Sequence, residues 1–176
     1  MCRSLASVFR YSNDMENPLA ETSEELIHLR NYLRIMNLRF NNEIEFKINV
    51  DLACLVALIP RLSLQPIVEN AIVHGLRDKR GEKIIEFISC LEQQDIIFTI
   101  KDNGIGMDAK TITQQFLSGR EDVLSRGSSI GLANIDSRIK LLFGNKYGVI
   151  LESTLGRGSS VSIRVPFQTE KKHEYS

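Results

Sequence analysis

The sequence predicts an α+β fold: a two-layer α/β sandwich with helices on one face of a mixed, mainly antiparallel sheet. Two observations predict it. Segments with helical and with strand-like periodicity follow one another in the order helix, strand, helix, hairpin, loop, helix, hairpin. The strands after the second helix come as adjacent pairs, so helices are expected to segregate to one side of the sheet.

Length and composition fit one globular domain. The chain has 176 residues, of which 43% are hydrophobic, enough for an ordinary core. Lys plus Arg and Asp plus Glu both total 22 and no long basic run occurs, so we expect no direct nucleic-acid partner. Cys2, Cys54 and Cys90 are odd in number and far apart, which suits neither a zinc site nor a disulfide framework. No apolar stretch approaches the roughly 20 residues of a membrane span.

The first full helix is predicted from Thr22 to about Phe40. Thr22 and Glu25 have the spacing of a capping box, and the apolar residues that follow recur at intervals of three and four: Leu26, Leu29, Leu33, Met36 and Phe40. Residues 1–20 carry a short apolar helical face and then a polar, proline-containing stretch. We expect residues 1–20 to be the end of a helical region that begins upstream, and residues 21–168 to form the globular domain.

Alternation of apolar and polar residues predicts a strand over Glu43–Val50. A second helix is predicted to open at Pro60, to be kinked or delayed by Pro66, and to stop at Gly75. Two strands that form a hairpin are predicted at Lys83–Leu91 and Asp95–Lys101. A long loop over Asp108–Ser129 and a helix over Ile130–Phe143 follow, and the last strands are predicted at Val149–Ser153 and Ser160–Val165. A loop of that length in a compact domain suggests a functional lid or disorder, and 169–176 is a polar tail.

Three segments have the residue types of a ligand site, and the first is NAIVHG on the second helix. Asn70 and His74 lie one helical turn apart and therefore on one face. An amide oxygen there could coordinate Mg²⁺ and a ring nitrogen could reach a phosphate. Taken alone, the pattern suits a solvated helix face as well.

The second segment is DNGIGMD, at the end of a predicted strand. Asp102 can accept a hydrogen bond from an exocyclic amine, while Gly104 and Gly106 allow the backbone to approach a flat ring closely. An ordinary turn would explain the same letters.

The third segment is RGSSIGLANI, in which Gly127 and Gly131 lead into a helix whose first amides are free to hold an anion. The segment has no lysine after its second glycine and is not a Walker loop. It also lacks the strand-first context of the dinucleotide fingerprint.

Together with GRGSSVSIRVP, these segments occur in the order and spacing of the N, G1, G2 and G3 boxes of the ATP-binding superfamily shared by gyrase, Hsp90, histidine kinases and MutL. FRYS, YLRIMNLRF, IPRLSLQPIVENAIVHG and SRIKLLFG further resemble sensor histidine kinases of the LytS/YesM type. The resemblance covers nearly the whole chain, and it implies that residues 1–20 are the end of a dimerisation and phosphoacceptor helical region and that residues 21–168 are the ATP-binding catalytic domain. It implies the Bergerat-type ATP-binding fold, with ATP and Mg²⁺ as ligands.

The resemblance also implies residue roles. Asn70 would hold Mg²⁺ against the phosphates, with His74 close by, and Asp102 would accept from the adenine amino group, helped by a water at Ser159. The remaining implied ATP-binding residues are Gly104, Ile105, Gly106 and Met107 around adenine, and Gly127, Gly131 and Leu132 in the lid over phosphate.

Two positions depart from the superfamily pattern. Ser129 replaces the usual second glycine of the G2 box, which restricts that loop. Pro66 stands where the hydrolases of the superfamily carry an acid, which favours phosphoryl transfer over hydrolysis. No catalytic residue is assigned, and Glu69 is the one candidate, for which a structural role is the better explanation. The acceptor histidine of the resembled kinases has no match in this chain, so we expect no autophosphorylation.

The function implied is the ATP-binding catalytic domain of a two-component sensor histidine kinase. Its partners would be a response regulator receiver domain and a second copy of the parent protein, which would dimerise through the upstream helices. The domain would be cytoplasmic, in a membrane-anchored sensor. The alternatives are an ATPase clamp of the gyrase or Hsp90 kind and a degenerate module without catalysis.

Overall fold

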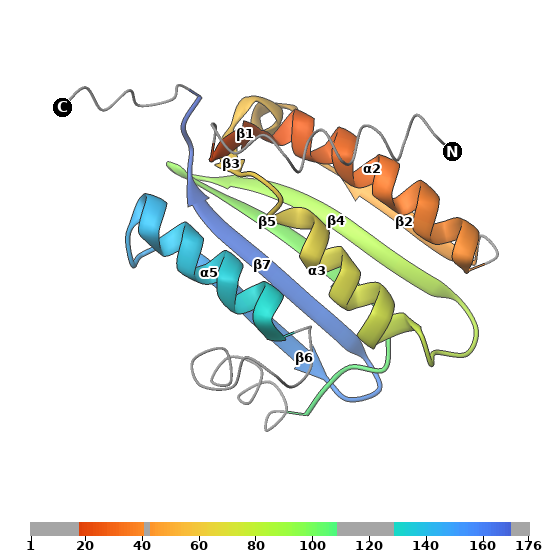
Figure 1. The fold of residues 1–176 in the computed structure, drawn as a ribbon. Coiled ribbons are helices and arrows are strands. Elements are labelled where there is room, and N and C mark those ends of the chain that lie inside the picture. Colours follow the sequence, from red (N-terminus) through yellow and green to blue (C-terminus); the bar gives the residue numbers. More distant parts are fainter. Residues whose placement is uncertain (1–17, 41–42, 109–128, 170–176) are drawn as a thin grey trace.

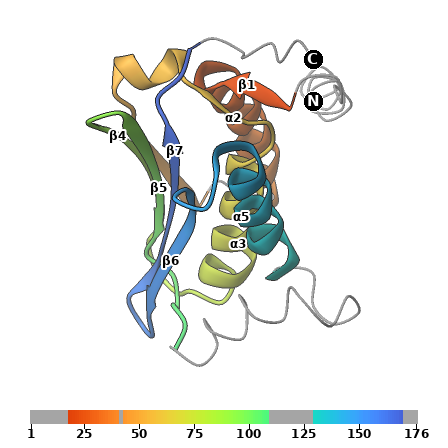
Figure 2. The same cartoon turned by 90° about the vertical axis from the view of Figure 1, so that its left-hand side faces the viewer.

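The structure is a computed structural model that describes residues 18–40, 43–108 and 129–169. Three helices, α2 (Thr22–Arg39), α3 (Leu64–Asn70) and α5 (Ser129–Phe143), cover one face of a five-stranded sheet (Figures 1 and 2). The predicted two-layer α+β sandwich is therefore confirmed. The expected upstream helix end, the lid and the polar tail fall mainly on residues 1–17, 109–128 and 170–176, outside the described residues.

The main sheet has the strand order β2-β4-β5-β7-β6. Its strands are β2 (Ile44–Asn49), β4 (Lys83–Glu92), β5 (Asp95–Asp102), β6 (Gly148–Thr154) and β7 (Gly158–Pro166). β2 runs parallel to β4, whereas the other neighbours are antiparallel. The predicted hairpins β4–β5 and β6–β7 are present, and β5 pairs with β7 to join them into one sheet.

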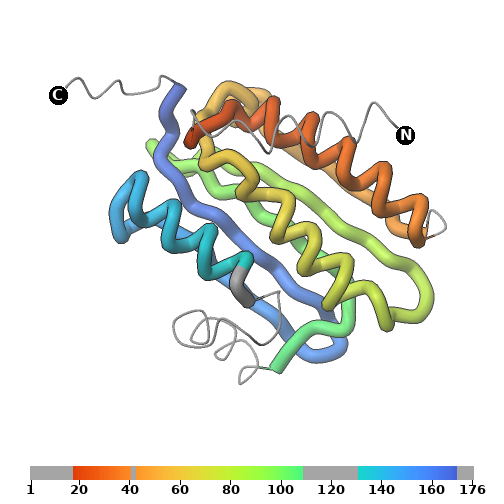
Figure 3. Tube along the Cα trace, viewed as in Figure 1, coloured from red at the N-terminus to blue at the C-terminus, as the bar shows by residue number. Residues whose placement is uncertain are grey.

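The core lies between the helices and the sheet. α3 lies between α2 and α5 (Figure 3). The predicted apolar stripe of this segment, which continues past the end of α3, is buried throughout: Leu64, Ile67, Val68, Ala71 and Ile72. Leu26, Leu29 and Leu33 of α2 are also buried, whereas Met36 and Phe40 only pack against the edge of the core. The alternation of β4 and β5 places Phe87 and Phe98 inside, with ring centroids 6.0 Å apart.

The prediction that Pro60 opens the second helix is wrong. Pro60 ends β3 (Leu58–Pro60), which pairs with β1 (Leu19–Glu21) in a two-stranded sheet. The chain then turns at Leu62, whose φ is +58°, and α3 begins at Leu64. Pro66 therefore falls in the first turn, where a backbone N–H has no helical partner and its loss costs little. The chain continues past Gly75 as a π-helix, η2 (Ala71–Leu76).

The predicted capping box of Thr22 and Glu25 does not form. No side chain caps the start of α2, and the Thr22 hydroxyl instead donates to the carbonyl of Ala57 at 3.0 Å. Glu25 is 1% exposed and points to the start of α3. Its carboxylate accepts from the backbone N–H groups of Leu62, Ser63 and Leu64 at 2.7, 3.2 and 3.4 Å. The acid therefore caps a helix remote in sequence, because its own helix directs it into the interface.

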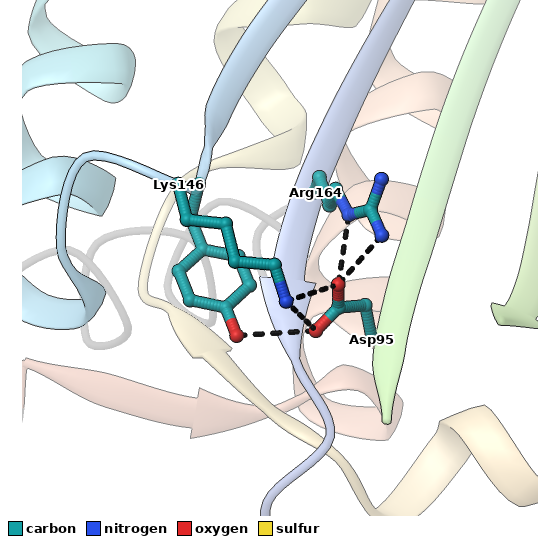
Figure 4. Close-up of polar contacts among 4 residues, drawn as sticks. Asp95, Lys146 and Arg164 are labelled. Carbon is teal, nitrogen blue, oxygen red and sulfur yellow. Dashed lines mark hydrogen bonds and ion pairs between the residues drawn. The ribbon is translucent and has the colours of Figure 1, made fainter. Parts of the chain in front are cut away.

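An ionic cluster around the buried carboxylate of Asp95 connects strands at the end of the sheet where β5 begins (Figure 4). Asp95 is 3% exposed and accepts two hydrogen bonds from Arg164, at 2.9 and 2.7 Å. Tyr147 donates to the same carboxylate at 3.1 Å, and the Lys146 ammonium lies 3.0 Å away. Burial raises the pKa of Asp95, but these donors outweigh it and the net pKa is lowered.

Two short features were not predicted from the sequence: the β1–β3 strand pair and a 3₁₀ helix, η1 (Leu52–Val56), which follows β2. Asp51 caps the start of η1, where its carboxylate accepts a hydrogen bond from the Ala53 N–H at 2.9 Å. Of the cysteines in the described residues, Cys54 is buried and Cys90 exposed, both as free thiols. None of the described helices is both long and apolar enough to cross a membrane.

Candidate functional site

A pocket of about 470 Å³, which includes space open to solvent, lies between α3 and η2 on one side and β5, β6 and β7 on the other. Seven of the predicted ATP-binding residues are on its wall: Asn70, His74, Asp102, Gly106, Met107, Leu132 and Ser159. Sequence segments nearly 90 positions apart are thus brought around one cavity.

Asp102 is the acidic group of this pocket. It is the last residue of β5, and its carboxylate accepts from the Gly104 N–H at 2.8 Å and from the backbone N–H of Ser159, its partner on β7. Burial raises the pKa of Asp102, and these two hydrogen bonds and the charge of Lys79 oppose that rise only in part. A half-buried carboxylate at the end of an apolar slot is suited to accept hydrogen bonds from a ligand amine.

The glycines next to Asp102 are required by contact between the N and G1 segments. A Cβ on Gly104 would overlap the carbonyl of Gly75 and lie 2.6 Å from Asp102 Oδ1, and a Cβ on Gly75 would also lie 2.6 Å from that oxygen. The Ile105 N–H donates to the Gly75 carbonyl at 2.9 Å. Gly104 and Ile105 therefore join the two segments directly behind the pocket, instead of lining it.

Gly106 is on the pocket wall in a left-handed conformation, with φ +66°, and a side chain there would overlap the carbonyl of Thr154. The next residue, Met107, donates its N–H to the Ser153 hydroxyl at 2.8 Å. Ser153 also exchanges a hydrogen bond with Ser159 at 2.9 Å. The G1 segment is thus fixed to the β6–β7 hairpin, which closes the pocket on that side.

Asn70 and His74 lie along one helical face at the pocket, as predicted. Asn70 is half-buried, and among the described residues no hydrogen bond engages its side-chain amide. Burial lowers the pKa of His74, and the positive charge of Arg77 lowers it further. Its imidazole is therefore neutral at pH 7, when it can donate one hydrogen bond and accept another.

Several wall residues were not predicted, and most of them are apolar: Ile67, Ala71, Gly75, Ile100, Leu151 and Val161. The periodicity of the strands could have identified some of these wall residues, because Ile100 precedes Asp102 by two strand positions and Val161 follows Ser159 by two. Each pair shares one face of its strand. Ile67 precedes Asn70 and His74 at helical spacing. These residues give the slot apolar walls that suit an aromatic ring.

The remaining predicted residues stand apart from this wall. Gly131 is the third residue of α5, where a backbone N–H has no partner within the helix, and it faces Pro66. Gly127 lies outside the described residues, and Ser129 begins α5. Glu69 is not on the pocket wall, and its Oε1 accepts from Gln65 at 2.7 Å.

The two-layer fold and this pocket together define a nucleotide-binding domain, with an apolar slot for a base, a carboxylate at its end, and an amide and an imidazole at its mouth. Residues 59–169 match the family described as histidine kinase-, DNA gyrase B- and HSP90-like ATPases. The chain belongs to this family, and ATP is accordingly the nucleotide that the domain binds.

Sensor kinases are among the similar proteins. The chain is 31% identical to the sensor histidine kinase YesM of Bacillus subtilis over 97% of its own length and 28% of that protein. It is also 31% identical to the sensor protein LytS of Staphylococcus haemolyticus, over 85% of its own length and 25% of that protein. The chain therefore spans about a quarter of the length of these curated relatives.

Solved structures support the fold. The catalytic domain of the histidine kinase ThkA superposes with a TM-score of 0.60 at 11% identity, over 85% of this chain and 95% of that one. The histidine kinase domain of a blue-light activated kinase from Erythrobacter litoralis gives a TM-score of 0.58 at 14% identity, over 94% of this chain and 72% of that one.

Proposed function

We propose that this chain is the ATP-binding catalytic domain of a sensor histidine kinase, which transfers the γ-phosphoryl group of ATP to a histidine outside this chain. A receiver domain of a response regulator would then accept the phosphoryl group. The observation that carries the proposal is the placement of Asp102 at the end of an apolar slot whose mouth is lined by Asn70 and His74. Family membership and the similarity to sensor kinases supply the reaction.

In this proposal, Asp102 accepts from the adenine amino group, and Ser159 holds a water beside it. Gly104, Ile105, Gly106 and Met107 shape the adenine end of the pocket. Gly127, Gly131 and Leu132 belong to the lid over the phosphates. The N–H of Gly131 at the start of α5 suits an anion, because the first amides of a helix lack partners and carry the positive end of its dipole.

Mg²⁺ fits the donor set at the mouth of the pocket. An amide oxygen is a hard ligand of the kind that Mg²⁺ accepts, and the Asn70 side chain is not engaged by another described residue. One protein ligand suffices, because Mg²⁺ in such sites keeps waters and phosphate oxygens as its other ligands. Bound there, the ion would neutralise charge on the phosphates, while neutral His74 would donate a hydrogen bond to them.

Transfer to an acceptor is favoured over hydrolysis by the place of Pro66. It lies one helical turn before Asn70, in the first turn of α3, where an acid able to activate water would have to stand. An ATPase clamp predicts steady-state ATP turnover that an Asn70→Ala substitution abolishes. A degenerate module predicts no thermal stabilisation by ATP with Mg²⁺, whereas a binding domain is stabilised by an amount that grows with the logarithm of the ligand concentration above its dissociation constant.

Residues 1–20 and 169–176 are proposed as the end of the dimerisation helices and a polar tail, on either side of a catalytic domain at 21–168. The parent protein is proposed to dimerise through those helices and to be anchored in the membrane, with this domain in the cytoplasm. Since the acceptor histidine lies outside this chain, the isolated chain should bind ATP without phosphorylating itself. Labelled ATP that modifies any residue of the chain would contradict this arrangement.

The direct test is calorimetric titration with a non-hydrolysable ATP analogue and Mg²⁺. The wild type should bind, and Asp102→Ala should lose measurable affinity. Glu45→Ala is the matched control, because Glu45 is an exposed acid on β2 that pairs, within the described part of the chain, only with exposed Lys47 at 3.6 Å. Absence of binding in the wild type would favour the degenerate module, and equal binding by Asp102→Ala would remove the adenine role of Asp102.

A further inference from the structure

The strand β2 forms one edge of the main sheet, and α2 runs along it on the helix side (Figure 1). Asn37, near the end of α2, covers the first position of this edge. Its side-chain amide donates to the carbonyl of Ile44 at 3.1 Å, and its oxygen accepts from the N–H of the same residue at 3.1 Å. A neighbouring strand can make the same pair of bonds, so Asn37 closes the edge at Ile44.

The next two outward-facing positions of this edge are open. Along a strand, the main-chain N–H and C=O of every second residue point to the same side, so Phe46 and Ile48 direct theirs where Ile44 does, away from β4. Within the described part of the chain, no hydrogen bond engages these four groups. Neither position carries a proline or a charged side chain, the usual means of blocking an edge. The edge can therefore pair with another strand.

A groove of about 1730 Å³, which includes space open to solvent, runs between α2 and this edge. Its deepest residues are apolar: Leu33 of α2 is buried, and Phe46 and Ile48 are partly buried. Towards its two ends along α2 lie Ile27 and Leu38, which are 62% and 54% exposed. Exposed apolar residues beside an open strand edge suit a segment that brings both main-chain groups and apolar side chains.

Two arginines give the groove its charge. Arg30 and Arg34 lie on its wall between the two exposed apolar residues, and both are exposed. Neither forms an ion pair or hydrogen bond with another described residue, and the described residues of the wall include no acid. The two residues are about 6 Å apart along the helix axis, and alternate side chains of a strand are about 6.6 Å apart. Two carboxylates at alternate strand positions would therefore match the two guanidinium groups.

A second copy of this chain does not complement the groove. Pairing of two β2 edges about a two-fold axis would place Arg30 and Arg34 of both copies at one interface. Since the described wall has no acid to neutralise them, the four like charges would oppose such a dimer. The groove therefore requires a partner of the opposite charge.

We propose that the groove between α2 and β2 is a docking site for an extended acidic segment of a partner protein, which adds a strand to β2 and directs alternate side chains into the groove. Apolar side chains of that segment would pack on Ile27 and Leu38, and two carboxylates between them would pair with Arg30 and Arg34. The groove shares no residue with the described wall of the ATP pocket, so the proposal does not depend on ATP binding.

The test uses a synthetic probe, the peptide TITETETIT. As a strand it presents isoleucine, glutamate, glutamate and isoleucine on one face, in an order that is the same in both strand directions. In fluorescence anisotropy the wild type should bind it saturably below about 1 mM. The peptide TITKTKTIT, with lysine in place of both glutamates, should bind at least about tenfold more weakly.

Charge reversal in the domain should reverse this preference. The double variant Arg30→Glu with Arg34→Glu should lose at least about tenfold in affinity for TITETETIT and should bind TITKTKTIT more tightly than the wild type does. The double variant Arg80→Glu with Arg157→Glu is the control matched in net charge, because both arginines are exposed and lie outside the groove. If the first variant does not fold, as judged by circular dichroism, the comparison of the two peptides on the wild type decides the question of charge.

Pairing of the main chain has a separate readout in amide hydrogen exchange measured by NMR. In the free domain the amide of Ile44, bonded to Asn37, should exchange more slowly than those of Phe46 and Ile48. A saturating amount of TITETETIT should slow exchange at Phe46 and Ile48 at least about tenfold.

Three outcomes would overturn the proposal. If TITETETIT does not bind saturably to the wild type, or binds no better than TITKTKTIT, the groove does not recognise an acidic segment. Binding that leaves exchange at Phe46 and Ile48 unchanged would rule out an added strand. A dimer in analytical ultracentrifugation that the peptide dissociates would show that a second copy of the chain covers this edge instead.

Discussion

Replacing Glu25 with alanine should destabilise the domain far more than replacing Glu24, the other acid of α2. Glu25 is 1% exposed, and its carboxylate is the acceptor for the N–H groups at the start of α3. Alanine would leave those donors in a buried interface without a protein partner. It would also remove the negative charge that faces the half-buried guanidinium of Arg138 on α5.

The size of the effect follows from these contacts. The bond to Leu62 at 2.7 Å is short, the one to Ser63 at 3.2 Å is ordinary, and the one to Leu64 at 3.4 Å is long. A hydrogen bond to a charged group contributes about 1.5–3 kcal/mol. Relief from desolvating the carboxylate offsets part of the loss, so we expect Glu25→Ala to cost about 3 kcal/mol. Glu25→Gln, which keeps one acceptor, should cost about 2 kcal/mol.

Urea unfolding followed by circular dichroism measures the change in the free energy of unfolding. The slope of that free energy against urea concentration should be the same for the variants and the wild type. Glu24→Ala is the matched control. Its carboxylate is 53% exposed and lies 3.7 Å from Arg61, so it should change the unfolding free energy by less than about 0.5 kcal/mol. If Glu25→Ala unfolds within about 0.5 kcal/mol of the wild type, Glu25 is not what stabilises the start of α3.

Three further predictions use the same assays. Asp102→Asn should bind the ATP analogue at least about tenfold more weakly than the wild type. Burial raises the pKa of Asp102, which means that its negative charge disfavours the folded state at neutral pH. Without nucleotide, the variant should therefore be at least as stable in urea as the wild type. Gly104→Ala should cost about 3 kcal/mol in urea, because its methyl group would overlap the Gly75 carbonyl, which is fixed backbone; a loss under about 1 kcal/mol would show that the two segments can separate. The lowered pKa of Asp95 means that its stabilisation is complete above the unfolded value of about 3.9 and is lost as pH falls through the lower folded value. Asp95→Asn should therefore cost about 2 kcal/mol at pH 7 and progressively less in acid, and a cost that does not vary with pH would contradict this origin.

Regular periodicity predicted most of the fold, and tertiary contacts decided the rest. The helix from Thr22, the helix ending at Phe143 and both hairpins have patterns long enough to show their period. The three-residue strands β1 and β3 are too short for that, and they exist because Leu19–Glu21 and Leu58–Pro60 pair across almost 40 positions. Pro60 consequently looked like a helix start, the commonest local use of such a proline.

Part of the candidate site could likewise be predicted from the sequence, and part depended on tertiary contacts. The glycine segments placed Asp102, Asn70 and His74 at one pocket, because box order and spacing carry that information. The use of Glu25 to cap α3 had no local signal, since this residue also fits an amphipathic helix, and only packing shows which face meets α3. The roles of Gly127 and the lid remain predictions.

The place of β7 in the sheet has a consequence for how the chain folds during synthesis. β7 is the last of the described strands to be made, yet it lies between β5 and β6 and contributes Ser159 and Val161 to the pocket. The β4–β5 hairpin can form early from local contacts, whereas β5 and β7 pair across more than 50 positions and must close a long loop first. A ribosome that stalls before Pro166 therefore leaves β6 without its partner and β5 with an open edge. The ATP pocket can appear only when the whole domain has left the exit tunnel, so nucleotide cannot assist the earlier steps.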